Sequence, residues 1–203
     1  MEYKEEALRF LRHTKYREKR ERDMDNLSIQ EIINELELKP HPEGGYYKET
    51  YRSNGTIGEN SLPDNMQGYR RYSTSIHYLL KSDQKSAFHR IKSDEIWHFH
   101  SGDPVEIFEI NASGELETTV IGLNIREKQQ LTHVVLANRW FAARPLNSAK
   151  KQGFSLMSCN VAPGFDPLDF EMANQTILKE QIGRYPALEE LTMKVSTTNY
   201  FPS

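Results

Sequence analysis

Apolar and polar positions follow two patterns in this chain, and the change falls near residue 46. Before that point, apolar residues recur at three- and four-residue spacing, which predicts a helix. Its apolar face consists of Ile29, Ile32, Ile33 and Leu36. The helix should begin at Ser28, because Ser28 and Glu31 have the spacing of a capping box. Pro40 and Pro42 end the helical pattern.

From residue 46 onward, short apolar runs are separated by turn residues. The runs are YYKETYRS, YSTSIHYLL, AFHRI, DEIWHFH, VEIFEI, LETTVIG, THVVL, WFAARPL and FSLMSCNVA. Many short strands at a spacing of roughly 8 to 12 residues are typical of a sandwich or barrel and argue against alternating strands and helices. Behind Pro163–Asp166, a helical pattern broken near Gly183 and Pro186 predicts two short helices on the outside of the barrel. The sequence therefore predicts an all-β fold with short N-terminal and C-terminal helices.

Length and charge limit the domain organisation and the partners. The chain has 203 residues, of which 37% are hydrophobic, and this suits a single core. We expect residues 1–25 to form a charged extension, either a helix or a tail, in front of one domain at residues 26–203. A net charge of -3 provides no positive field for nucleic acid.

Two further features concern the location of the protein. No apolar run approaches the roughly 18 residues of a membrane span, and the N-terminus lacks the apolar core of a secretory signal. Cys159 is the single cysteine, so no internal disulfide can form, and its apolar neighbours predict a buried structural thiol. We therefore expect a soluble, cytoplasmic protein with neither a membrane nor a nucleic acid as its partner.

The densest group of ionisable side chains lies on two consecutive predicted strands. His89 belongs to the first strand, and the second reads DEIWHFH. Strand alternation places Glu95, Trp97 and Phe99 on one face of that second strand. If this face points inward, an aromatic wall lies beside a carboxylate, and His89 can join it. The pattern predicts a pocket for a small polar molecule.

The other histidines admit two interpretations. His98 and His100 alternate with the Glu95 face, so an outer-face or subunit-interface role competes with a role in the pocket. His77 lies in TSIHYLL without a visible partner, and a structural role is its alternative. We keep His98 and His77 as candidate ligand contacts.

Three motifs in order along the chain carry a resemblance to a known family. They are HPEGG at His41–Gly45, FHRIKSDEIWHFHSG at Phe88–Gly102, and PGFD at Pro163–Asp166. Together they resemble the cupin superfamily, and within it the uncharacterised cupin family formerly called domain of unknown function 985. The resemblance covers about residues 27–195. It implies a double-stranded β-helix, a jelly-roll barrel with one open mouth, usually as a homodimer.

The chain departs from the metal-binding members of that superfamily. Those proteins carry a His-x-His pair before the glutamate and another histidine in a second motif. Here His89 stands alone before the glutamate, with Ala87 or Ile91 at the position of its partner. Phe141 replaces the histidine of the second motif.

This departure decides the cofactor prediction. His89 and Glu95 supply two ligands, whereas a firmly held divalent ion needs three or four. We predict no metal and no other cofactor. A weakly held divalent metal, with His77 or His98 completing the site, is the alternative.

The remaining models for function among cupins are the metal-independent sugar-nucleotide epimerases. By this resemblance we expect a metal-independent isomerase or epimerase of a carbohydrate-like or nucleotide-sugar substrate. His89 would be the general base, with Glu95 orienting it or acting as an acid. Trp97, Phe99 and Tyr47 would form dry walls.

Charged groups add further candidates. Arg52, Arg70, Arg71 and Arg90 could each bind an anionic group of the substrate, with a surface role as the alternative. Glu43, within HPEGG, is expected near the barrel mouth, although the motif can equally serve as a turn.

Two other functions stay open at this level. One is a non-catalytic sensor or binding module that uses the same pocket. The other is a metal-dependent oxygenase or hydrolase.

Overall fold

In the computed structural model, residues 27–146, 153–173, 180, 183 and 185–192 are described. The chain divides into two units, residues 1–37 and residues 38–203. In the first unit, helix α2 spans Ile29–Glu35. The backbone N–H of Glu31 donates to the Ser28 hydroxyl, and the Ser28 N–H donates to the Glu31 carboxylate at 2.8 Å. The capping box is confirmed, and the predicted extension at residues 1–25 lies outside the described residues.

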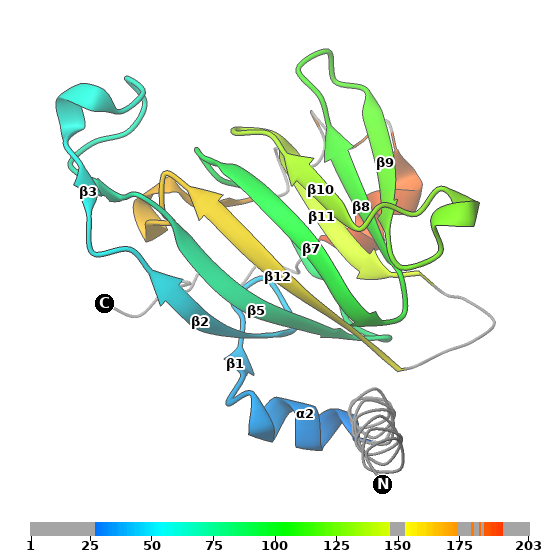
Figure 1. The fold of residues 1–203 in the computed structure, drawn as a ribbon. Helices are drawn as coiled ribbons and strands as arrows, with labels where there is room; N and C mark the ends of the chain where they lie inside the picture. Colours follow the sequence, from blue (N-terminus) through cyan, green and yellow to red (C-terminus); the bar gives the residue numbers. More distant parts are fainter. Residues whose placement is uncertain (1–26, 147–152, 174–179, 181–182, 184, 193–203) are drawn as a thin grey trace, which may run out of the picture. The chain divides into compact units, whose positions relative to one another are not determined.

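The second unit consists of two antiparallel sheets and a small hairpin (Figure 1). The six-stranded sheet has the order β1 (Lys39–Pro40), β2 (Tyr46–Arg52), β5 (Thr74–Lys81), β12 (Phe154–Ala162), β7 (Asp94–Gly102) and β10 (Thr132–Val135). The five-stranded sheet has the order β13 (Glu171–Met172), β6 (Ser86–Arg90), β11 (Trp140–Pro145), β8 (Val105–Ile110) and β9 (Leu116–Ile121). Strands β3 (Thr56–Ile57) and β4 (Arg70–Arg71) form the hairpin. The predicted all-β class is confirmed.

Short 3-10 helices occupy several connections. They are η1 (Glu59–Ser61), η2 (Ile125–Glu127), η3 (Pro167–Asp169) and η5 (Pro186–Leu191). Leu188 and Leu191 of η5 join a buried cluster with Phe88 and Trp140 of the five-stranded sheet. Of the two C-terminal helices that the sequence predicts, η5 accounts for one short segment, and the other falls mostly outside the described residues.

Strand alternation decides which side chains enter the barrel. Strand β12 pairs with β7 so that Val161 lies opposite Glu95 and Cys159 lies opposite Trp97. All four are buried, and Trp97 and Cys159 belong to the main apolar cluster between the sheets. The face of β7 that carries Glu95 therefore points inward.

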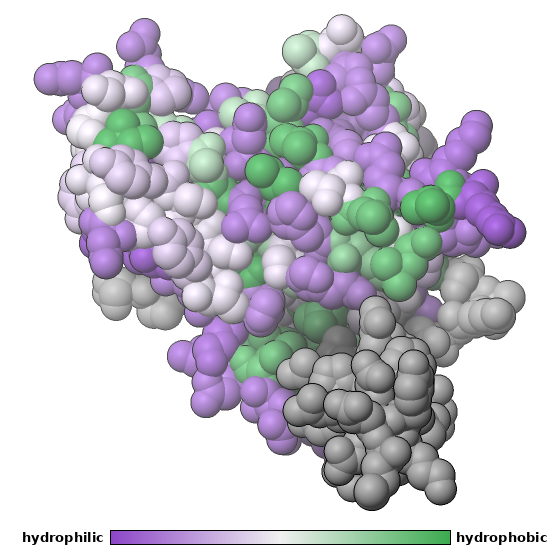
Figure 2. Space-filling view, viewed as in Figure 1, coloured by the Kyte–Doolittle hydropathy of each residue, from purple (hydrophilic) through white to green (hydrophobic). Residues whose placement is uncertain are grey.

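The exterior is mixed in character. Figure 2 shows hydrophobic residues as small separate patches among hydrophilic ones on the visible face. Within the part of the chain that the structure describes, no helix has the length and apolar character needed to cross a membrane.

Candidate functional site

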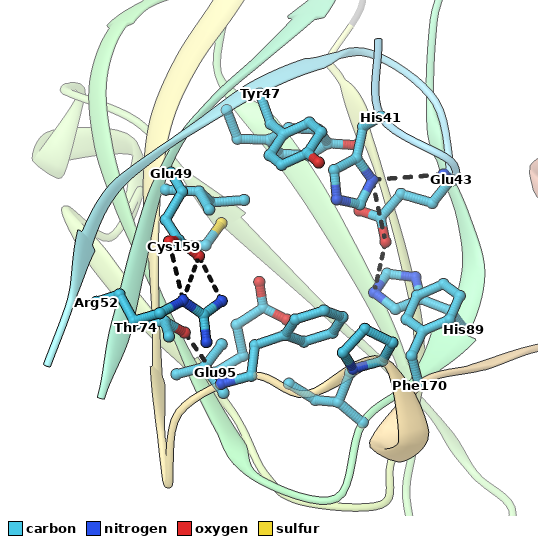
Figure 3. A pocket seen from close by; sticks show the side chains of 16 residues that line it. His41, Glu43, Tyr47, Glu49, Arg52, Thr74, His89, Glu95, Cys159 and Phe170 are labelled. Carbon is cyan, nitrogen blue, oxygen red and sulfur yellow. Dashed lines mark hydrogen bonds and ion pairs between the residues drawn. The ribbon is translucent and has the colours of Figure 1, made fainter. Parts of the chain in front are cut away.

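One cavity of about 200 Å³ lies inside the barrel (Figure 3). Its lining comes from β2, β5, β6, β7 and β12, from the turn before β2, and from the segment around η3. Aromatic and apolar side chains make up much of the wall, whereas carboxyl and imidazole groups gather inside it. Such a mixture of apolar walls and a few converging polar groups is typical of a small-molecule site.

An imidazole and a carboxylate form the centre of the polar group. His89 Nε2 lies 3.1 Å from Glu43 Oε2, and both side chains are buried. His89 Nδ1 lies 2.7 Å from the Ala87 carbonyl oxygen, which can only accept, so Nδ1 carries a proton. Nε2 is the nitrogen that faces the Glu43 carboxylate, as Figure 3 shows.

Packing fixes the His89 ring in this orientation. The ring of Phe141 lies 4.1 Å from it, and the ring of Phe170 stacks on it at 5.4 Å between centroids. By the sequence resemblance, Phe141 corresponds to the histidine of the second motif in metal-binding cupins, and here it supplies an aromatic contact to His89.

The HPEGG turn carries Glu43 into the cavity. Gly44 has a φ of +119°, and a Cβ atom there would lie 2.1 Å from the Lys85 carbonyl oxygen, so the turn requires glycine. The Tyr78 hydroxyl donates to the Gly44 carbonyl at 2.8 Å, and the Ala87 N–H donates to the Glu43 carbonyl at 3.0 Å. These bonds attach the turn to β5 and β6 and hold Glu43 next to His89.

Glu43 is ionised at neutral pH despite its burial. Burial raises the pKa of Glu43, but the charges of His89 and His41 and hydrogen bonds from Ser86 and Tyr78 outweigh it and lower this pKa overall. The Ser86 hydroxyl donates to Glu43 Oε1 at 2.7 Å. Burial lowers the pKa of His41, and the neighbouring Glu43 carboxylate opposes this shift.

Glu95 has the opposite behaviour. Burial, followed by repulsion from the Glu43 carboxylate, raises its pKa to about 8, and a hydrogen bond from Cys159 opposes the rise. At neutral pH the Glu95 carboxyl therefore keeps its proton while Glu43 has lost its own. Two carboxyl groups of one cavity thus differ in protonation state.

The raised pKa of Glu95 has a measurable consequence for the stability of the protein. The unfolded chain loses the Glu95 proton near the ordinary pKa of 4.5, whereas the folded chain keeps it until about pH 8. The contribution of Glu95 to stability is therefore complete below about pH 4.5 and is lost as the pH rises toward 8, by up to about 1.4 kcal/mol per pH unit. Glu95→Gln should remove this slope. Urea unfolding of both proteins across that range measures it, and parallel slopes would contradict a raised pKa.

The cavity includes four of the residues that the sequence predicted for the site. They are His89, Glu95, Tyr47 and Arg52. Trp97 and Phe99 point into the barrel but do not line the cavity. Trp97 is fully buried against Tyr78 and Phe141, with ring centroids 5.7 and 6.3 Å away. These two residues close the barrel beyond the cavity, because their rings fill the core.

His77 and His98 lie away from the cavity. His77 and His98 both lie opposite Ser158 of β12, and Ser158 is the neighbour of the inward-facing Cys159. His77 Nδ1 lies 3.1 Å from the Ser158 hydroxyl, and His98 Nδ1 lies 3.2 Å from the Thr132 hydroxyl. Since alternate side chains of a strand point to opposite faces, neither imidazole reaches a ligand in the cavity.

Other residues enter the site without having been predicted as part of it. They are His41, Glu49, Thr74, Ile76, Tyr78, Ile91, Cys159, Val161, Phe165, Pro167 and Phe170, and Glu43 was expected only near the mouth. Part of this set could have been found from strand alternation. Ile76 and Tyr78 lie two positions apart on β5, as Tyr47 and Glu49 do on β2, so each pair shares one face of its strand. Which of these alternating faces points inward was not visible from sequence.

The fold and the site define the class of protein first. Two antiparallel sheets that enclose one cavity with ionisable groups inside make a cupin-type barrel. More particularly, the chain belongs to the family described as Cupin superfamily (DUF985), whose family model matches residues 30–173. This confirms the family that the three motifs indicate.

Individual relatives agree with this assignment. The chain is 28% identical over 169 residues to the uncharacterized protein YML079W of Saccharomyces cerevisiae, covering 80% of this chain and 84% of that protein. Among solved structures it is similar to a hypothetical protein from Leishmania major, with a TM-score of 0.72 and 29% identity. It is also similar to protein SO0799 from Shewanella oneidensis, with a TM-score of 0.70 and 32% identity. Each comparison covers 82% of this chain and 98% of the other.

Many cupins hold a metal ion, so the donor atoms require examination. Among the described residues, no group of three or more histidine, cysteine, aspartate or glutamate side chains can hold one. In the cavity, His89 Nδ1 bonds to a backbone carbonyl and Nε2 faces Glu43 at hydrogen-bond distance. These donors do not fit the three- or four-ligand site that a metal-binding cupin needs.

Proposed function

We propose that this protein is a small-molecule-binding cupin that catalyses a metal-independent isomerisation or epimerisation. The substrate would be a carbohydrate-like molecule, or the sugar of a nucleotide sugar, with a carbonyl group next to an acidic C–H. One observation carries the proposal: a single cavity holds an ionised carboxylate paired with an imidazole and, close by, a carboxyl group that stays protonated. Acid and base roles commonly fall to groups whose pKa values are pushed apart in this way.

The base of the reaction would be His89, supported by Glu43. In this proposal His89 accepts the proton of the substrate C–H at Nε2, because Nδ1 already donates to the Ala87 carbonyl. The imidazolium that forms lies 3.1 Å from the Glu43 carboxylate, which neutralises its charge in place. Low polarity around the pair strengthens this stabilisation.

The acid would be Glu95. As the C–H bond breaks, its electron pair moves toward the carbonyl, and Glu95 gives its proton to the carbonyl oxygen. The neutral enol that results needs no cation to stabilise it. In a sugar whose enol is an enediol, His89 then gives its proton to the former carbonyl carbon, and the hydroxyl of the neighbouring carbon gives its proton to Glu95, so that this carbon becomes the new carbonyl and both groups are restored.

Solvent exchange tests this function directly. The protein is incubated in heavy water with sugars and nucleotide sugars that carry a carbonyl next to a C–H, and deuterium uptake at carbon is followed by NMR. We expect uptake that persists after treatment with a chelator. A ligand that binds in the cavity without any exchange would leave a binding module as the function, and loss of exchange on chelation would contradict metal independence.

Two expectations from the sequence stay predictions, namely the homodimer and the cytoplasmic location. Exposed apolar side chains give the homodimer some support. They include Leu123, Ile125, Leu131, Val134 and Leu136, on or near η2 and the edge strand β10. Sedimentation velocity should give twice the chain mass of 23.7 kDa. A single species at the mass of one chain would contradict the homodimer.

A further inference from the structure

Arg52 is the only lysine or arginine among the described residues that line the cavity. Its guanidinium is already engaged by a carboxylate of the same strand. Arg52 Nε donates to Glu49 Oε1 at 2.9 Å, and Nη2 donates to Glu49 Oε2 at 2.5 Å, as Figure 3 shows. The hydrogen bonds that Arg52 donates to Glu49 raise the pKa of Arg52; burial opposes this, and the charges of Glu49 and Asp166 add to the rise.

A β-bulge brings these two side chains together. Residues 49 and 52 of a regular strand would point to opposite faces. In β2, however, Glu49 lies opposite Ile76 and Tyr51 lies opposite Ser75, so the register shifts by one residue at Thr50. Glu49 and Arg52 therefore both line the cavity. Bulges next to binding sites often redirect a side chain in this manner.

The pairing leaves the cavity poorly suited to an anion. A phosphate or carboxylate group binds best to a guanidinium whose fork of N–H donors is available. Here Glu49 occupies two of these donors, and Glu43 adds an ionised carboxylate within the same cavity. An anionic ligand would meet two carboxylates, whereas the one guanidinium of the described lining is already paired with one of them, and like charges are unfavourable in a partly enclosed site.

We propose that Glu49 is the specificity-determining residue of the cavity, because by holding Arg52 it selects uncharged, compact, sugar-like ligands and rejects phosphorylated ones. The sugar-like character rests on the proposed function and narrows it to its uncharged, carbohydrate-like substrates, whereas the rejection of anions rests on the Glu49–Arg52 pair and the Glu43 carboxylate. The cavity volume of about 200 Å³ agrees with a compact ligand such as a single small ring.

The experiment compares the wild-type protein with Glu49→Gln. The probes are inorganic phosphate and two pairs of sugars, ribose with ribose 5-phosphate and glucose with glucose 6-phosphate. Binding is followed by the NMR signal of the Phe165 amide, which donates to the Thr74 hydroxyl at 3.0 Å in the cavity wall. We expect the wild-type protein to bind at least one free sugar about tenfold more tightly than its phosphate ester.

The variant should reverse this preference. In Glu49→Gln the guanidinium is released, so affinity for inorganic phosphate and for the phosphorylated sugar should rise about tenfold. Adding Arg52→Met to that variant should abolish the gain. Glu106→Gln is the matched control, because Glu106 pairs with Arg144 at 3.1 Å outside the cavity, and it should behave as the wild-type protein does.

Three outcomes would overturn the assignment. They are a wild-type preference for the phosphorylated sugars, an unchanged phosphate affinity in Glu49→Gln, and no binding of any free sugar to the wild-type protein. The Glu49 and Arg52 side chains are each about 40% exposed, so the variants should fold, and the dispersion of the amide spectrum checks this. A free sugar that binds selectively but exchanges no deuterium would contradict the proposed function and leave the selectivity standing.

Discussion

His89→Ala is expected to reduce deuterium exchange into a bound substrate by about 10² to 10⁴-fold, the usual contribution of a positioned general base. The reason is that, in the proposed reaction, Nε2 of His89 takes the proton from carbon, since Nδ1 already donates to the Ala87 carbonyl. His77→Ala is the matched control, since this histidine bonds to Ser158 on the opposite face of the sheet. Exchange should be unaffected in the control.

The same experiment separates catalysis from stability. His89→Ala leaves the buried Glu43 carboxylate without its main partner, so the protein could lose stability as well as activity. Glu43→Gln provides the second variant, because the amide can still accept from the Ser86 hydroxyl but cannot neutralise an imidazolium. We expect it to bind substrate and to exchange slowly. Full exchange in a folded His89→Ala protein would eliminate His89 as the base.

Arg70→Met is expected to destabilise the protein by about 3 to 5 kcal/mol, the usual cost of leaving one partner of a buried ion pair alone. Arg70 Nε and Nη2 donate to the two carboxylate oxygens of Asp169 at 2.6 and 2.7 Å, and both side chains are 3% exposed. Asp169 belongs to η3, the segment that places Pro167 and Phe170 in the cavity wall. The pair thus connects β4 to that wall.

Urea unfolding measures this effect. Arg144→Met is the control, because Arg144 pairs with Glu106 and Glu190 near the surface and such pairs contribute about 0 to 1 kcal/mol. Lys92 Nζ lies 3.4 Å from Asp169 and can compensate for part of the loss. If Arg70→Met and Arg144→Met have the same free energy of unfolding, the buried pair does not stabilise the wall. Should Arg70→Met fail to fold, Arg70→Lys keeps a charge and should show an intermediate loss.

The sequence determined much of the local structure. The capping box at Ser28 formed as predicted, because its partners are three residues apart and need no distant contact. The alternation in β7 also held, since the period of two is a property of the strand itself, and it separated Glu95 from His98. The family motifs gave the barrel class, which the family match and the sheets confirm.

The tertiary structure decided how these local elements combine into a site. Glu43 and His89 are 46 positions apart, and only the packing of the HPEGG turn against β6 makes them a pair. The bulge at Thr50 brings Glu49 and Arg52 to one face, although a regular strand would separate them. The alternation along β7 gave Trp97 an inward direction, but whether its ring lined a hollow or filled the core depended on Tyr78 and Phe141. A local pattern fixes the direction of a side chain, whereas distances, burial and pKa values depend on neighbours that the chain brings together only on folding.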